Sequence, residues 1–335
     1  GIALVADTAS PLGLEFDGVP GFGPLTLEKQ QGVSVDRTIP LVATKAATAR
    51  DHYRGATLVF RERAAKGRRL LVDVRAYDDG VAFRYRIGGT QPVRLRGERT
   101  AFVPAGDPEC LVSVATTAHE VPFELLKVSA LREGVAYDVP VVCTAPSGRT
   151  AYAITQANLG GYTGSSLWRE GGALRVKLSA QPRQAAPAVA SPAGLTTAWR
   201  VVMLGERAGD LIGSNLIGNL NPPAAGDFSW VRPGKAAWDW YSSPLAGMKP
   251  DMDSYRRFID FAADAGLPYY LIDAGWALGS GDCCDARPET DITRAAAGID
   301  MPELVRYAAS KGVGLILWAH WEHVRTRMDE VLDTY

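Results

Sequence analysis

The stretch Tyr269-Tyr270-Leu271-Ile272-Asp273-Ala274-Gly275-Trp276 decides how the last third of the chain folds. Its first four residues are apolar, as in a strand that is covered on both faces of a parallel sheet. An aspartate and a tryptophan then follow. The stretch therefore predicts a buried strand that brings Asp273 and Trp276 to the carboxyl edge of a sheet.

Amphipathic helices are predicted on both sides of this strand. In residues 252–265 the apolar residues recur at helical spacing, and residues 300–311 open with the spacing of a capping box, here with Asp as the cap. Apolar strands are predicted at residues 235–240 and 313–318. Three strands joined by helices are typical of parallel βαβ units.

A doubly wound sheet and a TIM barrel look alike over three strands, and the positions of the polar and aromatic residues favour the barrel. Trp238-Asp239-Trp240, Asp273–Trp276 and Trp318-Ala319-His320-Trp321 all follow predicted strands. In barrels this end of the strands carries the active site. Residues 230–335 are therefore predicted to be the first three βα units of a (β/α)8 TIM-type barrel, which is incomplete because three strands of eight cannot close it.

Residues 1–229 have a different pattern and predict an antiparallel β-sandwich, with a linker near its end at 215–223. Residues 70–77 and 81–87 flank a turn sequence, and the second run alternates apolar and polar residues with period two. That alternation predicts a hairpin with Val81, Phe83, Tyr85 and Ile87 on one buried face. Further short strands are predicted at residues 136–143, 151–155, 174–178 and 197–204.

The overall composition is that of a globular protein. Of the 335 residues 47% are hydrophobic and 22% charged, and the formal net charge is -1. This balance gives no electrostatic reason to expect nucleic acid as a partner. No apolar run approaches the ~20 residues that span a bilayer, so no membrane insertion is predicted. The first residues are predicted to be a strand and not a signal peptide, and no oligomeric state is predicted.

The four cysteines do not have the spacing of a zinc site. Free thiols in packed or loop positions are the leading expectation. A bond between Cys110 and Cys143, or a strained bond between the adjacent Cys283 and Cys284, is the alternative.

The residues at the predicted strand ends are suited to binding a sugar. Carboxylates accept charge-assisted hydrogen bonds from hydroxyl groups, and tryptophan faces stack on apolar C–H patches. Five of the eight tryptophans lie at or beside these strand ends. The candidate substrate-binding residues are Trp238, Asp239, Trp240, Asp273, Trp276, Trp318 and His320.

Five segments, in their order and spacing, resemble glycoside hydrolase family 97, whose members cleave α-glucosides or α-galactosides. They are residues 10–15 (SPLGLE), 75–85 (RAYDDGVAFRY), 209–216 (GDLIGSNL), 230–240 (WVRPGKAAWDW) and 307–318 (YAASKGVGLILW). The resemblance implies an N-terminal β-sandwich, a (β/α)8 barrel and a C-terminal β-domain. It also implies a bacterial, periplasmic or secreted, exo-acting enzyme that releases a terminal monosaccharide, either glucose or galactose, from an oligosaccharide or α-glycoside.

The resemblance places the general acid, and the base or nucleophile, on later barrel strands, beyond Tyr335. Glycoside hydrolysis needs two carboxylates, about 5–5.5 Å apart for retention and about 6.5–9.5 Å apart for inversion. No catalytic residue is therefore predicted in this chain, the stereochemical outcome stays open, and the chain alone is expected to be inactive. A non-catalytic carbohydrate-binding protein on the same scaffold is the alternative.

The resemblance further implies a Ca²⁺ ion beside the sugar, held by glutamates of the barrel and one of the N-terminal domain. In the matching segment, residues 153–159, Gln156 stands in the place of that glutamate. An amide oxygen can ligate Ca²⁺ but brings no charge, so weak or no binding to this chain alone is expected. The alternative for Gln156 is an edge-strand residue facing solvent. A second departure is Ala274, where the family often has Glu, and it predicts a changed substrate preference or a degenerate member.

The sequence His320-Trp321-Glu322-His323 only superficially suggests a metal site. It is not His-Glu-x-x-His, and after a strand the two histidines are not expected to share a helical face.

Overall fold

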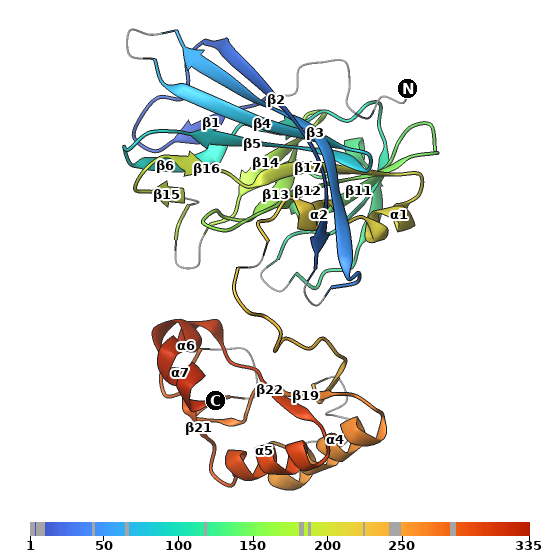
Figure 1. The fold of residues 1–335 in the computed structure, drawn as a ribbon, viewed down its shortest axis with the longest axis vertical. Coiled ribbons are helices and arrows are strands. Elements are labelled where there is room, and N and C mark those ends of the chain that lie inside the picture. Colours follow the sequence, from blue (N-terminus) through green and yellow to red (C-terminus); the bar gives the residue numbers. More distant parts are fainter. Residues whose placement is uncertain are drawn as a thin grey trace. The chain divides into compact units, whose positions relative to one another are not determined.

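The chain folds into two compact units, residues Gly1–Gly226 and Asp227–Tyr335, each with its own hydrophobic core (Figure 1). The structure is a computed structural model. It describes residue 4 and residues 11–335 except 42–43, 64–66, 117–118, 181–183, 187–188, 224, 241–248 and 282–285. The predicted domain boundary after residue 229 lies three residues beyond the end of the first unit.

The first unit is built on a ten-stranded sheet with the strand order β2-β3-β4-β5-β17-β12-β11-β8-β9, and with β16 paired to β5. Its strands are β2 (Leu25–Pro40), β3 (Thr48–Glu62), β4 (Arg69–Tyr77), β5 (Gly80–Ile87), β8 (Glu109–Val112), β9 (Glu124–Lys127), β11 (Val141–Thr144), β12 (Ala151–Ala157), β16 (Leu195–Thr196) and β17 (Trp199–Gly205). Neighbouring strands all pair antiparallel.

Two smaller antiparallel sheets complete the unit. One has the order β10-β13-β14-β7 and the other the order β1-β6-β15. Their strands are β1 (Leu14–Phe16), β6 (Val93–Glu98), β7 (Ala101–Phe102), β10 (Ala136–Tyr137), β13 (Ser165–Glu170), β14 (Ala173–Leu178) and β15 (Val189–Ser191). A short 3-10 helix, η1 (Val128–Ala130), follows β9. The main core joins Tyr85 of the large sheet with Leu95 and Leu167 of the small ones, so the mostly antiparallel N-terminal architecture agrees with the prediction.

The predicted hairpin is present as β4 and β5, with one difference. Phe83, Tyr85 and Ile87 pack in or against the main core, whereas Val81 is 43% exposed. On the opposite face Ala82 is only 1% exposed. The large sheet is therefore covered on both faces, which a simple period-two pattern does not anticipate.

The predicted linker at residues 215–223 is wrong for residues 216–220. Helix α2 (Leu216–Asn219) lies here, after helix α1 (Ala208–Gly213), and the side chains of Leu216 and Leu220 are buried in the core cluster that contains Trp199 of β17. These leucines cover the second face of the sheet. Their burial depends on strands from other parts of the chain. The local composition of residues 215–223 therefore does not reveal it.

Cys110 and Cys143 form a disulfide, so the expectation of free thiols is wrong for this pair. The two residues stand opposite each other in the neighbouring strands β8 and β11. The Cys110–Cys143 bond, given from the sequence as an alternative to free thiols, is confirmed. Cys283 and Cys284 lie outside the described residues.

The second unit contains a three-stranded parallel sheet of order β18-β19-β22. Its elements are β18 (Ala236–Trp238), α4 (Met252–Asp264), β19 (Tyr269–Ile272), β20 (Ala277–Leu278), β21 (Asp291–Ala295), α5 (Met301–Ser310), β22 (Gly314–Leu317), α6 (Trp321–Thr326) and α7 (Met328–Thr334). The parallel βαβ order that the sequence predicts is present. The antiparallel pair β20–β21, between β19 and α5, was not predicted.

Side-chain caps begin both long helices of this unit. Asp251 Oδ1 accepts the backbone N–H of Ser254 at 2.9 Å, and Asp300 Oδ1 accepts that of Glu303 at 2.9 Å. These bonds satisfy N–H groups that have no partner inside the helix. The apolar stripe of each helix packs in the second core, with Ile259 of α4 and Leu304 of α5 fully buried.

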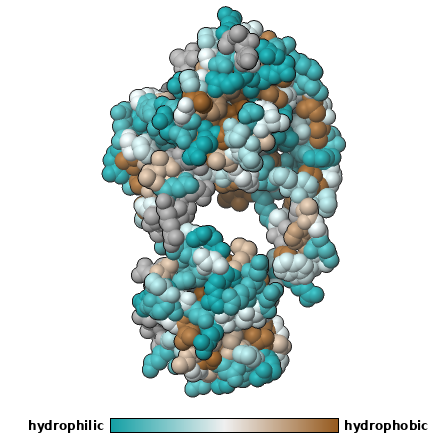
Figure 2. Space-filling view, turned by 90° about the vertical axis from the view of Figure 1, so that its left-hand side faces the viewer, coloured by the Kyte–Doolittle hydropathy of each residue, from teal (hydrophilic) through white to brown (hydrophobic). Residues whose placement is uncertain are grey.

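Hydrophilic residues dominate the face of the molecule in Figure 2, and hydrophobic residues lie there in separate small groups. Among the described residues no helix combines the length and the apolar character needed to cross a bilayer.

Candidate active site

Asp239 follows β18 and is almost fully buried, with 6% of its surface exposed. In the parallel register Ala237 of β18 stands beside Tyr270 of β19. The Tyr270 hydroxyl donates a hydrogen bond to Asp239 Oδ2 at 2.7 Å, and the backbone N–H of Asp273 also donates to this carboxylate. Two neighbouring strands therefore fix the position of Asp239.

The pKa of Asp239 is raised above the usual range of an aspartate. Burial is the largest cause, and the nearby negative charge of Asp273 adds to it, while the hydrogen bonds from Tyr270 and from the backbone act against it. A buried carboxylate beside a second carboxylate is costly to keep charged. Such an arrangement is typical of functional sites, where stability is given up for chemistry.

Asp239→Asn is expected to raise the free energy of unfolding at neutral pH. Because the folded-state pKa of Asp239 is raised, the native protein loses stability as the pH rises from about 3.9, the unfolded value, through the folded one. The uncharged amide removes that loss and still accepts the Tyr270 hydrogen bond. The gain should therefore vanish at acid pH, as measured by urea unfolding across pH. Asp253→Asn, at a side chain that is 97% exposed, is the control and should show no such trend. A gain that does not depend on pH would contradict the charge argument.

Asp273 follows β19 and is held by the indole of Trp238. The Trp238 Nε1–H donates to Asp273 Oδ2 at 2.6 Å, and the backbone N–H of Ala274 donates to Oδ1 at 2.7 Å. Asp273 is half-buried and Trp238 is 38% exposed. A carboxylate offers about four acceptor positions, so each oxygen of Asp273 keeps capacity for a ligand hydroxyl. The structure thus brings Trp238, Asp239 and Asp273 together at the carboxyl ends of β18 and β19.

The other candidate tryptophans do not join this cluster in the same way. Trp276 is only 2% exposed, and its Nε1–H donates to the Trp318 carbonyl at 2.7 Å. It packs in the second core, edge-on to Tyr335, where the sequence led us to expect a sugar-contacting side chain. The position of Trp276 after a strand predicted a side chain open to a ligand. Burial of its large apolar ring in the core gives another outcome. Trp240 is 41% exposed and precedes the undescribed residues 241–248.

His320 begins helix α6 and its Nδ1 accepts the backbone N–H of Glu322 at 3.3 Å. Because His320 caps α6 and His323 lies three residues further along the chain, the rings of His320 and His323 lie 5.9 Å apart. The sequence predicted that the two histidines do not share a helical face, whereas the structure brings their rings together at the start of α6. Both line a cavity of about 20 Å³ together with Trp276 and Trp318, and His323 Nε2 is buried there without a protein partner. The cavity has room for about one water molecule.

Gln156 belongs to the first unit and does not lie on an edge strand, because β12 runs between β17 and β11. Its Oε1 accepts hydrogen bonds from Arg200 Nη1 at 2.9 Å and from Ser165 Oγ at 2.8 Å. In the described part of the chain no group of three or more His, Cys, Asp and Glu side chains is placed to hold a metal ion.

Two features of these sites were missed from the sequence. Tyr270 was taken only as one of four apolar strand residues, although a buried tyrosine hydroxyl usually needs a polar partner. The buried ion pair between Glu98 and Arg200 left no sequence signal, because its members are 102 residues apart.

The fold and the site together define a protein with an N-terminal antiparallel β-domain and a parallel α/β unit that carries carboxylates and a tryptophan at its strand ends. The family model for the glycosyl-hydrolase 97 N-terminal domain matches residues 7–223, and the model for glycoside hydrolase 97 matches residues 230–335. The chain belongs to glycoside hydrolase family 97.

Two curated relatives share this family likeness. The chain is 29% identical to a retaining alpha-galactosidase of Bacteroides thetaiotaomicron, over 98% of the chain and 53% of that protein. It is 28% identical to a probable retaining alpha-galactosidase of Streptomyces bingchenggensis, over 95% of the chain and 48% of that protein. The chain therefore spans about half the length of these relatives.

Solved structures agree in fold. A glycoside hydrolase family 97 enzyme from Pseudoalteromonas sp. strain K8 superposes with a TM-score of 0.87 at 24% identity, over 99% of this chain and 52% of that one. A beta-arabinopyranosidase superposes with a TM-score of 0.75 at 22% identity, over 94% of this chain and 50% of that one.

Proposed function

We propose that the chain is part of an exo-acting α-glycosidase that releases a terminal monosaccharide, and that α-galactosides are its first substrates to test, with α-glucosides second. The cluster of Trp238, Asp239 and Asp273 carries this proposal. A carboxylate with unused acceptor positions beside an exposed indole suits the hydroxyl rim and the C–H face of a sugar. Galactose is placed before glucose because both curated relatives are named as alpha-galactosidases.

We also propose that β18, β19 and β22 with their helices are the first three units of a (β/α)8 barrel. The strands are parallel and stand in sequence order, as in such barrels, and the polar cluster lies at their carboxyl ends. Because the chain covers about half of its relatives, the remaining barrel strands would belong to a longer protein.

Asp239 and Asp273 are proposed as substrate-binding residues and not as the acid and base of hydrolysis. Asp239 is buried, and its carboxylate already receives hydrogen bonds from Tyr270 and from the backbone of Asp273, which suits a role in holding the sugar site more than proton transfer to a glycosidic oxygen. Asp273 is oriented by Trp238 and Ala274. Acid and base would come from strands beyond β22, as the resemblance to the family implies.

The 335-residue chain, expressed alone, is expected to show no turnover of an aryl α-galactoside or aryl α-glucoside. General acid–base catalysis alone contributes about 10²–10⁴-fold, and both groups are placed outside this chain. Release of the chromogenic aryl alcohol, followed against the full-length protein, is the measurement. The full-length protein should release galactose.

Turnover by the purified 335-residue chain would mean that its carboxylates include the catalytic ones, and Asp239, Asp273 and Glu322 would be substituted first. A full-length protein that binds the sugars but hydrolyses neither would instead favour the non-catalytic carbohydrate-binding alternative.

A further inference from the structure

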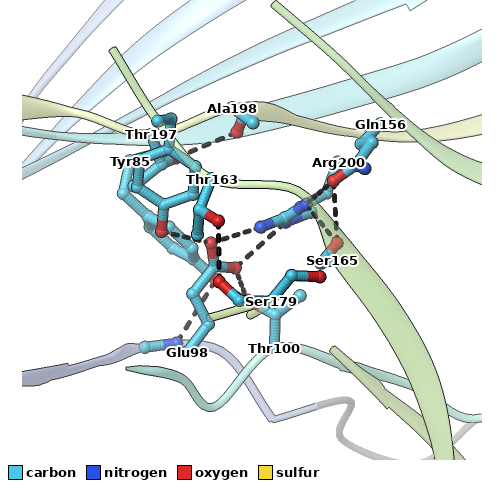
Figure 3. A network of polar contacts seen from close by, with 12 residues as sticks. Tyr85, Glu98, Thr100, Gln156, Thr163, Ser165, Ser179, Thr197, Ala198 and Arg200 are labelled. Carbon is cyan, nitrogen blue, oxygen red and sulfur yellow. Dashed lines mark hydrogen bonds and ion pairs between the residues drawn. The ribbon is translucent and has the colours of Figure 1, made fainter. Parts of the chain in front are cut away.

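A buried polar network lies behind Gln156 in the first unit (Figure 3). Its centre is the ion pair between Arg200 Nη2 and Glu98 Oε1, 2.6 Å apart, with side chains that are 1% and 0% exposed. The hydroxyls of Tyr162 and Thr100 donate to the same carboxylate at 2.7 and 3.0 Å. Burial alone would lower the pKa of Arg200, but the Glu98 carboxylate raises it. Arg200 is therefore a fixed cation.

The network determines which end of the Gln156 amide faces inward. Arg200 Nη1 can only donate, so the atom of Gln156 that lies 2.9 Å from it must be the carbonyl oxygen. Ser165 Oγ donates to that same oxygen at 2.8 Å and itself accepts from Arg200 Nη1 at 2.9 Å. Both lone pairs of the amide oxygen are thus engaged. The opposite orientation would set two donors against each other.

The Nε2 amide nitrogen of Gln156 is consequently turned toward an open groove of about 990 Å³, which Gln156 and Ser165 line. A Cβ placed on Gly164, another lining residue, would stand 3.8 Å from this nitrogen. Among the described residues no side chain or carbonyl is hydrogen-bonded to Nε2. The wall of the groove at this point presents N–H donors.

We infer that Gln156 is not a calcium ligand, because the Glu98–Arg200 pair turns its amide so that N–H groups, and not the carbonyl oxygen, face the groove. A metal ion would have to share an oxygen that already serves a guanidinium, and the two positive charges would repel each other at close range. The wall suits a ligand group that accepts hydrogen bonds.

The other described residues of the groove do not supply a calcium site either. Ca²⁺ takes about 6–8 oxygen ligands, and usually several carboxylates. The described lining contains one carboxylate, Asp138, whose Oδ2 lies 2.8 Å from His119 Nδ1, and one ammonium group, Lys177. The residues present do not fit the calcium ion that the family resemblance implies for Gln156.

The test compares the Ca²⁺ affinity of the full-length native protein with that of Gln156→Met, measured by titration calorimetry. Methionine has a similar length and carries no oxygen. The two dissociation constants should agree within about twofold, whereas losing a true ligand or its support costs about 10–100-fold. Absence of Ca²⁺ binding in the native protein would also agree with the inference. A loss of tenfold or more in Gln156→Met would overturn it.

Gln156→Glu keeps the inference testable if the methionine variant fails to fold. Its carboxylate can accept the same hydrogen bonds from Arg200 and Ser165, so the network should persist. A carboxylate in the coordination sphere would tighten Ca²⁺ binding, and such tightening by tenfold or more would equally overturn the inference. We expect an unchanged affinity, because the inference places no Ca²⁺ ion within reach of this side chain. For the Gln156→Met variant, the control is Gln31→Met on the exposed strand β2, which replaces a glutamine by methionine in the same way.

Discussion

Arg200→Met is expected to lower the free energy of unfolding of the first unit by about 3–5 kcal/mol, the usual effect of removing one member of a buried ion pair. The substitution leaves the Glu98 carboxylate in the core with only the hydroxyls of Tyr162 and Thr100 as donors. Gln156 and Ser165 lose a donor as well. Urea unfolding followed by fluorescence and circular dichroism measures the change.

The matched control is Arg94→Met. Arg94 pairs with Asp17 at 3.2 Å, with side chains that are 62% and 49% exposed. Exposed pairs contribute only about 0–1 kcal/mol, so this variant should unfold almost like the native protein. Equal effects of the two substitutions would show that Glu98 finds another counter-charge when Arg200 is absent.

Asp273→Ala in the full-length protein is expected to lower kcat/KM for an aryl α-galactoside by about 10–150-fold, which corresponds to one charge-assisted hydrogen bond of about 1.5–3 kcal/mol. The loss includes the contacts to sugar hydroxyls that we propose. The Trp238 indole is also held less firmly in the variant, because its Nε1–H loses its acceptor. Initial rates over a range of substrate concentrations measure the effect.

Asp273→Asn separates these two contributions. The amide oxygen can still accept the Trp238 hydrogen bond, so the indole should stay in place while the charge is lost. Its kcat/KM should fall between those of the native protein and Asp273→Ala. Asp329→Asn on the exposed face of α7 is the control, and unchanged kinetics in Asp273→Ala would refute the assignment of Asp273 to substrate binding.

The elements that the sequence predicted well are those determined by local patterns. Strand β19 ends where the apolar run ends, at Ile272, and helix α5 begins at the cap that Asp300 provides. Caps and periodicity act over a few residues, so a single sequence displays them. The missed helix α2 differs, because Leu216 is buried by a sheet whose strands come from distant parts of the chain.

The candidate site was likewise predictable only where a local sequence pattern determines it. Position after a strand correctly grouped Asp239 and Asp273, since parallel strands deliver their carboxyl ends to one edge. It could not distinguish the exposed Trp238 from the buried Trp276, because burial depends on packing against Trp318 and Tyr335. Nor could a motif match show that the amide oxygen of Gln156 is already bound by an arginine.

The edges of the two sheets differ in a way that affects self-association. Strand β2, at one edge of the large sheet, carries Glu28 and Asp36, which pair across the sheet with Arg69 at 3.0 Å and Arg50 at 2.7 Å. Charged side chains on an edge strand disfavour pairing with another molecule. Strand β22, an edge of the described parallel sheet, has the sequence Gly-Leu-Ile-Leu and no charge. Intermolecular strand pairing of the 335-residue chain is therefore expected at β22, at the position where the proposed barrel would add its next strand.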